Sequence, residues 1–581
     1  MPYRIDSIRP KHGPAIALHQ LTVLVGPNNC GKSQTLRDIR EFSNTGSLSR
    51  LVILEAVQVT LPTATELKSA VQIRPHKDAV GHIMVSAVKD DLQSQSSFGP
   101  QESWFDETFG PAMDSNFRQQ EILRALGTCL IAYLGAEARF KLTESTAGFN
   151  TRSEAPGNAL QSLFAADSAV ITELRKAFKT AFGMDIGLDW GAMTRLYLRV
   201  AKDFGDIPDS REALDALMAD AEELQKQGDG FRSFTGIALA MLAYPKRVIL
   251  LDEPEAFLHP AQARVLGRWV AKQAALRPAQ VVVATHSADF LAGLVGSGEA
   301  AKILRLNRGG LTTKFHEVPP AVTSSLIQSP LLSSQPVLDS MFHRGVVICE
   351  GDPDRAVYQT VAHRTSEQMG EDFLFIHSNG KDAAHSPAEL LRQSGTPVCV
   401  ITDFDVLNSE AVLERIVEGL TGHGLDEGTR TLRQQVAAAV EAKSEQQSYE
   451  ELRASVIEWL EQSGDLRHAR RSLVAAARAG SNKWDKAKKV GLAALPETEQ
   501  ARGHALLALL AGHGLFVVPR GSLESWLPLG VKKGSEWNRR ALEQLYEGQC
   551  ASDLRTFVAT ALSSLVTLSP TALSPDAAGP A

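Results

Sequence analysis

An apolar run that leads directly into a glycine-rich loop constrains this chain more than any other feature. Residues 21–25 read Leu-Thr-Val-Leu-Val, and they precede a loop of the form G-x-x-x-x-G-K-S and then a helical pattern. Such a loop turns its backbone N–H groups toward phosphate oxygens, while its lysine and its hydroxyl serve the β/γ-phosphates and Mg²⁺. The sequence therefore predicts a nucleotide site formed by Gly26, Pro27, Asn28, Asn29, Cys30, Gly31, Lys32, Ser33 and Gln34.

Two further apolar runs end in residues that suit the same site. Asp252 and Glu253 follow residues 248–251, and His286 comes shortly after residues 281–284. Asp252 at a strand end can reach Mg²⁺ through water, and Glu253 beside it can polarise an attacking water. His286 is expected to sense the γ-phosphate. We therefore expect ATP as the nucleotide, with Mg²⁺ held between Ser33 and Asp252.

Length and composition limit the class of protein. The chain has 581 residues, of which 44% are hydrophobic and 22% charged, as in soluble proteins of two to four domains. The net charge of −7 argues against a protein that coats nucleic acid everywhere, but not against a local basic groove. No apolar run suits a membrane span, no signal sequence is apparent, and five scattered cysteines suit a reducing compartment. We expect a cytoplasmic protein.

A second set of strand ends carries carboxylates. Glu350 follows residues 345–349, and Asp403 and Asp405 follow residues 397–402. The carboxyl ends of parallel strands meet at one edge of a sheet, so these acids are expected to lie together. Carboxylates this close repel one another unless a cation neutralises them, and oxygen ligands suit Mg²⁺ or Mn²⁺. The sequence predicts a metal site for phosphodiester chemistry, with solvated acidic turns as the alternative.

Two more acids follow Glu350. Asp352 precedes Pro353, which is the order of an N-cap and a first helical residue, so helix capping is the favoured interpretation of Asp352. Asp354 comes four residues after Glu350 and is expected to point back toward the metal site.

The chain divides into two α/β regions around a Pro/Ser-rich stretch. In the second region, apolar runs separated by helical patterns predict a mostly parallel sheet. These runs are 345–349, 373–377, 397–402 and 515–518. We expect an ATPase domain at 1–325, with a mostly helical insertion at 46–225, and a linker at 326–340. The second domain is expected at 341–550, with a helical insertion at 410–505. A C-terminal helix and a disordered tail are expected at 551–581.

The order of the nucleotide motifs resembles that of ABC-type ATPase heads of the RecF, Rad50 and SMC kind. Residues 228–233 (Gly-Asp-Gly-Phe-Arg-Ser) match the position of the signature loop, although that loop usually begins Ser-Gly-Gly. Residues 258–260 (Leu-His-Pro) follow as in these heads, and Gln58 is the candidate for their metal-contacting glutamine. The resemblance implies a homodimer or higher homo-oligomer in which one subunit's signature loop completes its partner's nucleotide site. By elimination, residues 46–225 are the expected dimerisation element.

The acidic motifs resemble those of the Toprim domain of topoisomerases, primases and some nucleases. A Toprim domain after an ABC-type head is the plan of the OLD (overcoming lysogenisation defect) nuclease family, and the Gabija phage-defence nuclease has this plan at a similar length. The resemblance covers residues 1–310 and about 340–540. It implies a nucleotide-regulated DNA endonuclease of phage defence, with a possible helicase or other defence partner.

Three late residues are assigned on that resemblance alone. Glu524, in the G-x-x-E that follows the last apolar run, looks like the ligand of a second metal ion. A late lysine near the scissile phosphate would be Lys532 or Lys533, with Lys381 as an alternative. Glu350 is expected to serve also as the general base.

A basic segment is the expected DNA contact. Residues 465–489 contain eight lysines and arginines, two aspartates and Trp484. Backbone phosphates require such a basic stripe, and an exposed aromatic ring can stack on an unpaired base. We expect contact with DNA, double-stranded by preference, while a solvated helical face is the alternative.

Three other functions remain open on the sequence. The chain could be a RecF-like repair ATPase with a silent Toprim fold, although an intact set of acids argues against silence. The chain could also be a topoisomerase or a primase. A topoisomerase would require a catalytic tyrosine, and no motif in the sequence marks one. A scaffold for a helicase or toxin would keep the ATP site and tolerate loss of Glu350.

Overall fold

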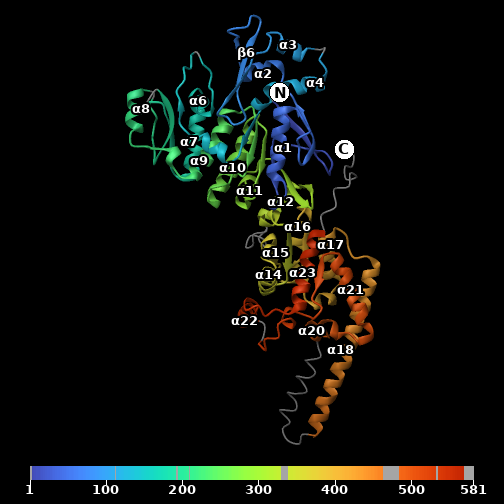
Figure 1. Ribbon diagram of the computed structural model, residues 1–581. Helices are drawn as coiled ribbons and strands as arrows, with labels where there is room; N and C mark the ends of the chain where they lie inside the picture. The colour runs from blue at the N-terminus through green and yellow to red at the C-terminus, as the bar shows by residue number, and fades with distance from the viewer. Residues whose placement is uncertain are drawn as a thin grey trace. The chain divides into compact units, whose positions relative to one another are not determined.

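The computed structural model describes residues 3–110, 113–152, 154–191, 194–208, 210–328, 338–461, 483–531 and 534–567 (Figure 1). Contacts divide the chain into two compact units, one within residues 1–324 and one within residues 325–574. Each unit has its own sheet and its own core, and each is described by itself.

The first unit is organised around a six-stranded sheet in the order β16-β15-β3-β14-β13-β8. Five of these strands are parallel, and β16 pairs antiparallel with β15 at one edge. Strands covered on both faces read as continuous apolar runs, and every residue of β3 and β14 is buried. The strands are β3 Leu21–Val25, β8 Ile131–Leu134, β13 Val248–Asp252, β14 Val281–Ala284, β15 Lys302–Gly309 and β16 Thr312–Val318.

Helices after these strands carry the chain from one to the next. In α1, Gly46 closes the helix in the left-handed conformation, where glycine is the favoured residue. In α10, His259 caps the first turn and Pro260 occupies the first helical position. The helices are α1 Lys32–Thr45, α9 Asp229–Ala243, α10 Pro260–Leu276, α11 Ala288–Val295 and α12 Pro320–Gln328.

A small antiparallel sheet of order β2-β1-β4 contributes to the same core. Its strands are β1 Arg4–Pro10, β2 Ile16–Ala17 and β4 Leu54–Thr60. Ile5 and Ile8 of β1 are buried, and Gln280 bonds to both backbone groups of Ile5.

Residues 46–225, expected to be mostly helical, contain strands as well as helices. Strand β4 pairs with β1 and β8 joins the main sheet, so parts of this segment belong to the head itself. A short apolar run such as residues 131–134 cannot be told from a buried helical turn by periodicity, which explains the difference. The remaining strands are β5 Gln72–Pro75, β6 Ile83–Val88, β7 Gln95–Phe98, β9 Thr146–Ala147, β10 Asp185–Asp189, β11 Arg195–Ala201 and β12 Glu222–Glu223. The helices are α2 Ala64–Ala70, α3 Trp104–Phe109, α4 Ser115–Leu126, α5 Ala136–Lys141, α6 Ala159–Phe164, α7 Ser168–Phe182 and α8 Arg211–Met218.

The second unit contains a four-stranded parallel sheet in the order β18-β17-β19-β20. The strands are β17 Gly345–Cys349, β18 Phe373–His377, β19 Val398–Thr402 and β20 Leu515–Val517. Each lies within one residue of its expected apolar run. The hydrophobic core of the second unit lies between this sheet and flanking helices and contains residues such as Val347, Tyr358 and Trp537. These helices include α14 Asp352–Thr365, α15 Glu367–Asp372, α16 His385–Gln393, α22 Ser535–Tyr546 and α23 Ser552–Thr567.

Helices occupy the described part of the segment between β19 and β20 (orange in Figure 1). They are α17 Glu410–Thr421, α18 Glu427–Glu461, α20 Lys483–Val490 and α21 Gln500–Gly512. Helix α20 packs on α18 and on the short helix η5 Phe404–Asn408, directly after β19. Residues 462–482, most of the expected linker and the expected tail from 568 lie outside the described residues.

Among the described residues, no helix is both long enough and apolar enough to cross a bilayer.

Candidate functional site

The glycine-rich loop lies between β3 and α1, as the sequence predicts. Gly26 and Gly31 have φ values of 144° and 107°, which favour glycine, and a Cβ at Gly26 would clash with the carbonyl oxygen of Leu306. A pocket of about 380 Å³ opens on the loop. It is lined by Asn28, Asn29, Cys30, Gly31, Lys32, Ser33, Gln34 and Glu253, and also by Lys11, His12, Arg37, Val52, Ile53, Arg308, Leu311 and Thr313.

The loop lysine and serine are positioned by nearby oxygens. Lys32 Nζ donates to the carbonyl oxygens of Gly26 at 2.7 Å and Pro27 at 3.0 Å. Ser33 Oγ donates to Asp252 Oδ1 at 2.7 Å. The structure thus brings together the two residues that the sequence assigns to Mg²⁺.

Two residues that the sequence analysis missed hold Asp252 in place. The hydroxyl of Tyr133, at the end of β8, donates to Asp252 Oδ2 at 2.8 Å. Burial, and then the negative charge of Asp252, raise the pKa of the Tyr133 hydroxyl, so it stays a donor. Buried Arg139 donates to the backbone oxygen of Asp252 at 2.7 Å. The signal for both was weak because they lie on short elements: Tyr133 on β8, of four residues, and Arg139 on α5, of six.

Glu253 and His286 meet beside Asp252. The Nδ1 of His286 is 3.6 Å from Glu253 Oε1 and 3.4 Å from Glu255 Oε1. Glu255 is buried, and its Oε1 accepts hydrogen bonds from the Thr285 hydroxyl and the His286 backbone N–H. Glu255 therefore positions the segment that carries His286. The sequence did not indicate this role for Glu255.

The two remaining motifs of the head lie on other elements. Gly228 caps α9, so residues 228–233 form the start of that helix. Gly230 lies so close to the backbone of Phe257 that a Cβ would be 2.8 Å from its carbonyl oxygen. Gln58 lies on β4, where it accepts a hydrogen bond from Ser7, and it is not among the residues that line the pocket.

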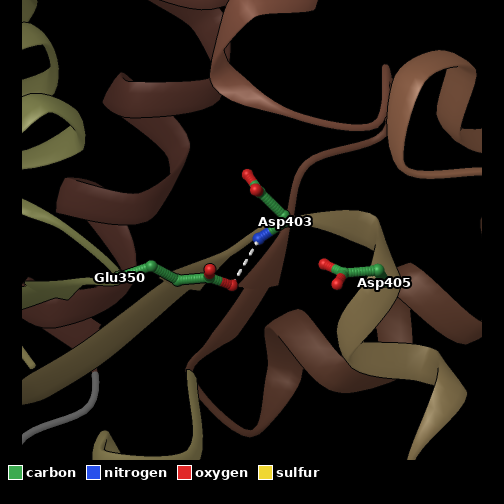
Figure 2. A group of neighbouring side chains, drawn as sticks. All are labelled: Glu350, Asp403 and Asp405. Atoms are coloured by element: carbon green, nitrogen blue, oxygen red, sulfur yellow. Dashed lines mark hydrogen bonds between the residues drawn. The ribbon is translucent and has the colours of Figure 1, made fainter. Parts of the chain in front are cut away.

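In the second unit, Glu350, Asp403 and Asp405 come together at the carboxyl edge of the parallel sheet (Figure 2). One carboxylate oxygen from each lies within 4.8 Å of the others. Glu350 follows β17 and the two aspartates follow β19, which are neighbouring strands. Glu350 Oε1 accepts a 3.0 Å hydrogen bond from the backbone N–H of Asp403. We call these three residues the acid cluster.

The electrostatics of the acid cluster fit a cation site. Burial, followed by the charge of Asp403, raises the pKa of Glu350 to about 7. Lys488 Nζ lies 3.0 Å from Asp403 Oδ2 and 3.4 Å from Asp405 Oδ1. Lys381 Nζ donates to Asp405 Oδ2 at 2.6 Å. Three partly buried carboxylates that already attract two ammonium groups offer the oxygen donors that Mg²⁺ and Mn²⁺ prefer.

Asp354 and Asp352 have structural partners. The helix α14 is capped by Gly351 and not by Asp352, because Asp354 at the third position accepts the Gly351 N–H at 3.1 Å. Asp352 is the first helical residue and pairs with Arg355 at 2.7 Å. The N-cap expectation for Asp352 was therefore wrong by one residue. Asp354, four positions after Glu350, is buried, but it is not one of the three residues of the acid cluster.

Glu524 lies on the short helix η8 Leu523–Ser525 and is partly buried. The loop before it reaches the acid cluster, since the carbonyl of Gly521 accepts the Phe404 N–H at 2.7 Å. Glu524 is not one of the three clustered acids. Lys532 and Lys533 lie outside the described residues.

Trp484 corrects the expectation of an exposed stacking ring. Its side chain is only 4% exposed, and its ring centroid is 6.4 Å from that of Phe404. It belongs to the packing of α20 against η5. Most of the basic segment lies outside the described residues, but Lys486, Lys488 and Lys489 on α20 are described, and Lys489 is exposed.

Comparison with protein families matches each unit separately. Residues 151–292 match a family described as "AAA domain, putative AbiEii toxin, Type IV TA system". Residues 341–405 match a family described as "Overcoming lysogenization defect protein-like, TOPRIM domain". The first range contains Asp252 and His286, and the second contains the whole acid cluster. The expected α/β fold is confirmed, with a match to the AAA domain description in the first unit and to the OLD-like Toprim description in the second.

No curated protein matches the chain. Similar solved structures include an SMC head bound to the C-winged helix domain of ScpA, at 15% identity over 54% of this chain and 97% of that chain, with a TM-score of 0.33. An SMC head with an extended coiled coil, bound to the C-terminal domain of ScpA from Pyrococcus furiosus, matches at 12% identity over 56% and 99%, with a TM-score of 0.32. The SMC head domain from Thermotoga maritima matches at 13% identity over 54% and 99%, with a TM-score of 0.28.

Proposed function

We propose that this chain is a nucleotide-regulated, divalent-metal-dependent DNA endonuclease. The proposal rests on its plan of an ABC-type ATPase domain followed by an OLD-like Toprim domain, which is the plan of the OLD nuclease family. The observation that carries the proposal is the acid cluster, in which carboxylates from two neighbouring parallel strands approach one another within 4.8 Å. Toprim-type phosphodiester chemistry requires oxygen ligands at this edge of the sheet, and the chain supplies them.

Glu350, Asp403 and Asp405 would hold the ion, with Asp354 and Glu524 as further candidates on the sequence argument. A Mg²⁺ or Mn²⁺ ion supplies Lewis acidity toward a phosphoryl oxygen and neutralises the carboxylates. Glu350 is also the proposed general base, since its carboxylate lies at the acid cluster, where Oε1 accepts from the backbone N–H of Asp403. Among the described residues, Lys381 and Lys488 bring positive charge to the place where a scissile phosphate would carry negative charge.

The head is proposed to bind ATP through Lys32, Ser33 and Asp252, with Glu253 and His286 at the γ-phosphate. Contact between Ser33 and Asp252, and between His286 and Glu253, supports these roles. For ATP to control the nuclease, it must favour one arrangement of the protein over another. The two arrangements are proposed to differ in how the ATPase domains of a homodimer contact each other.

The proposed substrate is double-stranded DNA of an invading phage, met in the cytoplasm, with a helicase or other defence protein as a possible partner. The lysines of α20 support contact with DNA phosphates, since the chain as a whole is acidic, Lys488 lies beside the acid cluster and Lys489 on the same helix is exposed.

The test is plasmid cleavage by the purified protein with Mg²⁺ or Mn²⁺, without and with ATP. We expect cleavage by the wild type and at least a hundredfold slower cleavage by Glu350→Ala, which removes an ion ligand. Asp352→Ala is the matched control, since this exposed acid lies two residues away and pairs with Arg355 instead. Lys32→Ala gives the sign of nucleotide control.

The same experiment contains the outcome that contradicts the proposal. If the wild type turns over ATP and binds DNA but leaves the plasmid intact with either ion, the RecF-like or scaffold function is favoured. Cleavage that persists in Glu350→Ala would place the nuclease outside the acid cluster.

A further inference from the structure

Lys488 brings the helical insertion into contact with the acid cluster. Its Nζ contacts one oxygen of Asp403 at 3.0 Å and one oxygen of Asp405 at 3.4 Å, so a single ammonium bridges both aspartates. The Asp403 side chain is 7% exposed, whereas that of Lys488 is 41% exposed. A buried carboxylate is therefore neutralised by a cation that remains half in solvent.

The helix that carries Lys488 is held in place independently of this ion pair. Trp484 packs against Phe404, and the Ser525 hydroxyl donates to the carbonyl of Lys489 at 2.8 Å. Gly491, with φ 57°, leaves no room for a Cβ against the carbonyl of Pro519. Helix α20 can therefore stay where it is while the flexible stem of Lys488 turns its head group away from the aspartates.

Lys381 contacts the acid cluster differently. It donates both to the carboxylate of Asp405 at 2.6 Å and to the backbone oxygen of Asp405 at 3.1 Å. Its side chain is 22% exposed, and it lies on η4 Lys381–Ala383 between β18 and α16. Two contacts with one residue make Lys381 a fixed counter-ion of Asp405, whereas Lys488 can exchange partners.

We propose that Lys488 couples the binding of a divalent ion to the binding of DNA. This rests on the proposed nuclease function. Lys488 would compete with a bound ion for the carboxylates of Asp403 and Asp405, so occupancy of the ion site would favour the state in which Lys488 has left them. The displaced ammonium lies on a basic helix and becomes a ligand for a DNA phosphate. Because ion and DNA both favour the displaced state, each tightens the binding of the other, and by the same factor.

The first test measures Mn²⁺ affinity without DNA, by electron paramagnetic resonance of the free ion. Lys488→Gln removes the competing charge, so we expect about tenfold tighter Mn²⁺ binding than in the wild type. Lys489→Gln makes the same charge change one residue away on an exposed side chain, and we expect less than a twofold effect. Equal or weaker binding by Lys488→Gln would overturn the proposal.

The second test measures the coupling itself. The affinity for a fluorescent DNA duplex is compared in EDTA and in Ca²⁺, an ion that also prefers oxygen ligands. We expect Ca²⁺ to tighten DNA binding about fivefold or more in the wild type and at most twofold in Lys488→Gln. Lys488→Arg keeps the charge and should retain most of the coupling. Equal coupling in Lys488→Gln and the wild type would overturn the proposal.

Failure of the nuclease function is recognised separately. If Mn²⁺ binding is absent from the wild type, or is unchanged in Glu350→Gln, the acid cluster is not a metal site and both proposals fall. If Mn²⁺ binding depends on Glu350 but not on Lys488, only the coupling falls.

Discussion

The hydroxyl of Ser33 donates a 2.7 Å hydrogen bond to the carboxylate of Asp252, although 219 positions separate the two residues in the chain. The contact exists because β3 and β13 lie on either side of β14 and all three strands point the same way. The start of α1 and the end of β13 therefore meet at one edge of the sheet, where a phosphate and its metal ion can be held together.

Lys32→Ala should weaken ATP binding about tenfold or more, because it removes a charged donor from a largely buried site. Isothermal titration calorimetry with Mg²⁺ and ATP measures the change. Lys272→Ala, an exposed lysine on α10, is the control and should bind ATP as the wild type does. Unchanged affinity in Lys32→Ala would mean that the nucleotide is bound elsewhere.

Tyr133→Phe should slow ATP hydrolysis about tenfold while leaving the fold intact. The substitution removes the hydrogen bond that fixes Asp252 Oδ2 and leaves the ring in place. Hydrogen bonds to charged groups contribute about 1.5–3 kcal/mol, which is the scale of the expected effect. Steady-state phosphate release reports the rate, and a thermal melt within a few degrees of the wild type would exclude a folding defect. A wild-type rate would show that Asp252 is oriented without Tyr133.

Divalent-ion affinity should fall as the pH is lowered below about 7. The pKa of Glu350 is raised to about 7, so below that value its carboxyl is protonated and an ion must displace the proton. The affinity should drop by up to about tenfold per pH unit below 7 and level off above it. Glu350→Gln has no proton to lose and should bind weakly with a flatter profile between pH 6 and 7. A wild-type profile equally flat in that range would contradict the assignment.

Trp484→Phe should preserve DNA affinity, whereas Trp484→Ala should destabilise the second unit by about 3–5 kcal/mol. The reason is that Trp484 is buried against Phe404 and not presented to solvent. Denaturant unfolding and DNA binding by fluorescence anisotropy distinguish the two effects. If Trp484→Phe lost most of its affinity for DNA at wild-type stability, the ring would be a nucleic-acid contact after all.

The strand ends of both units could be predicted from the sequence because buried parallel strands are continuous apolar runs that stop abruptly. Glu350 and Asp403 each follow such a run, and parallel pairing then brings them to one edge. The same logic found Ser33 and Asp252. For these residues the local pattern and the tertiary arrangement carry the same information.

Lys488 and Tyr133 could not be found in that way. Lys488 reaches the acid cluster from a helix 83 positions beyond Asp405, so its role depends on how α20 packs. Trp484 was misread because a buried and an exposed aromatic ring among lysines look alike in composition. Trp484 and Ala487 are both buried and three positions apart, and that helical spacing was the signal that indicated an inward face.

The order in which the chain leaves the ribosome gives the insertion a further consequence. Strand β20 pairs with β19 through Val400 and Leu515, so every residue from 403 to 514 is synthesised before the sheet gains its fourth strand. At about 5–20 residues per second, β19 remains an edge strand for roughly ten seconds. Exposed strand edges pair with other chains. A chain truncated between β19 and β20 keeps β19 as an exposed edge strand, and it should be recovered as aggregate.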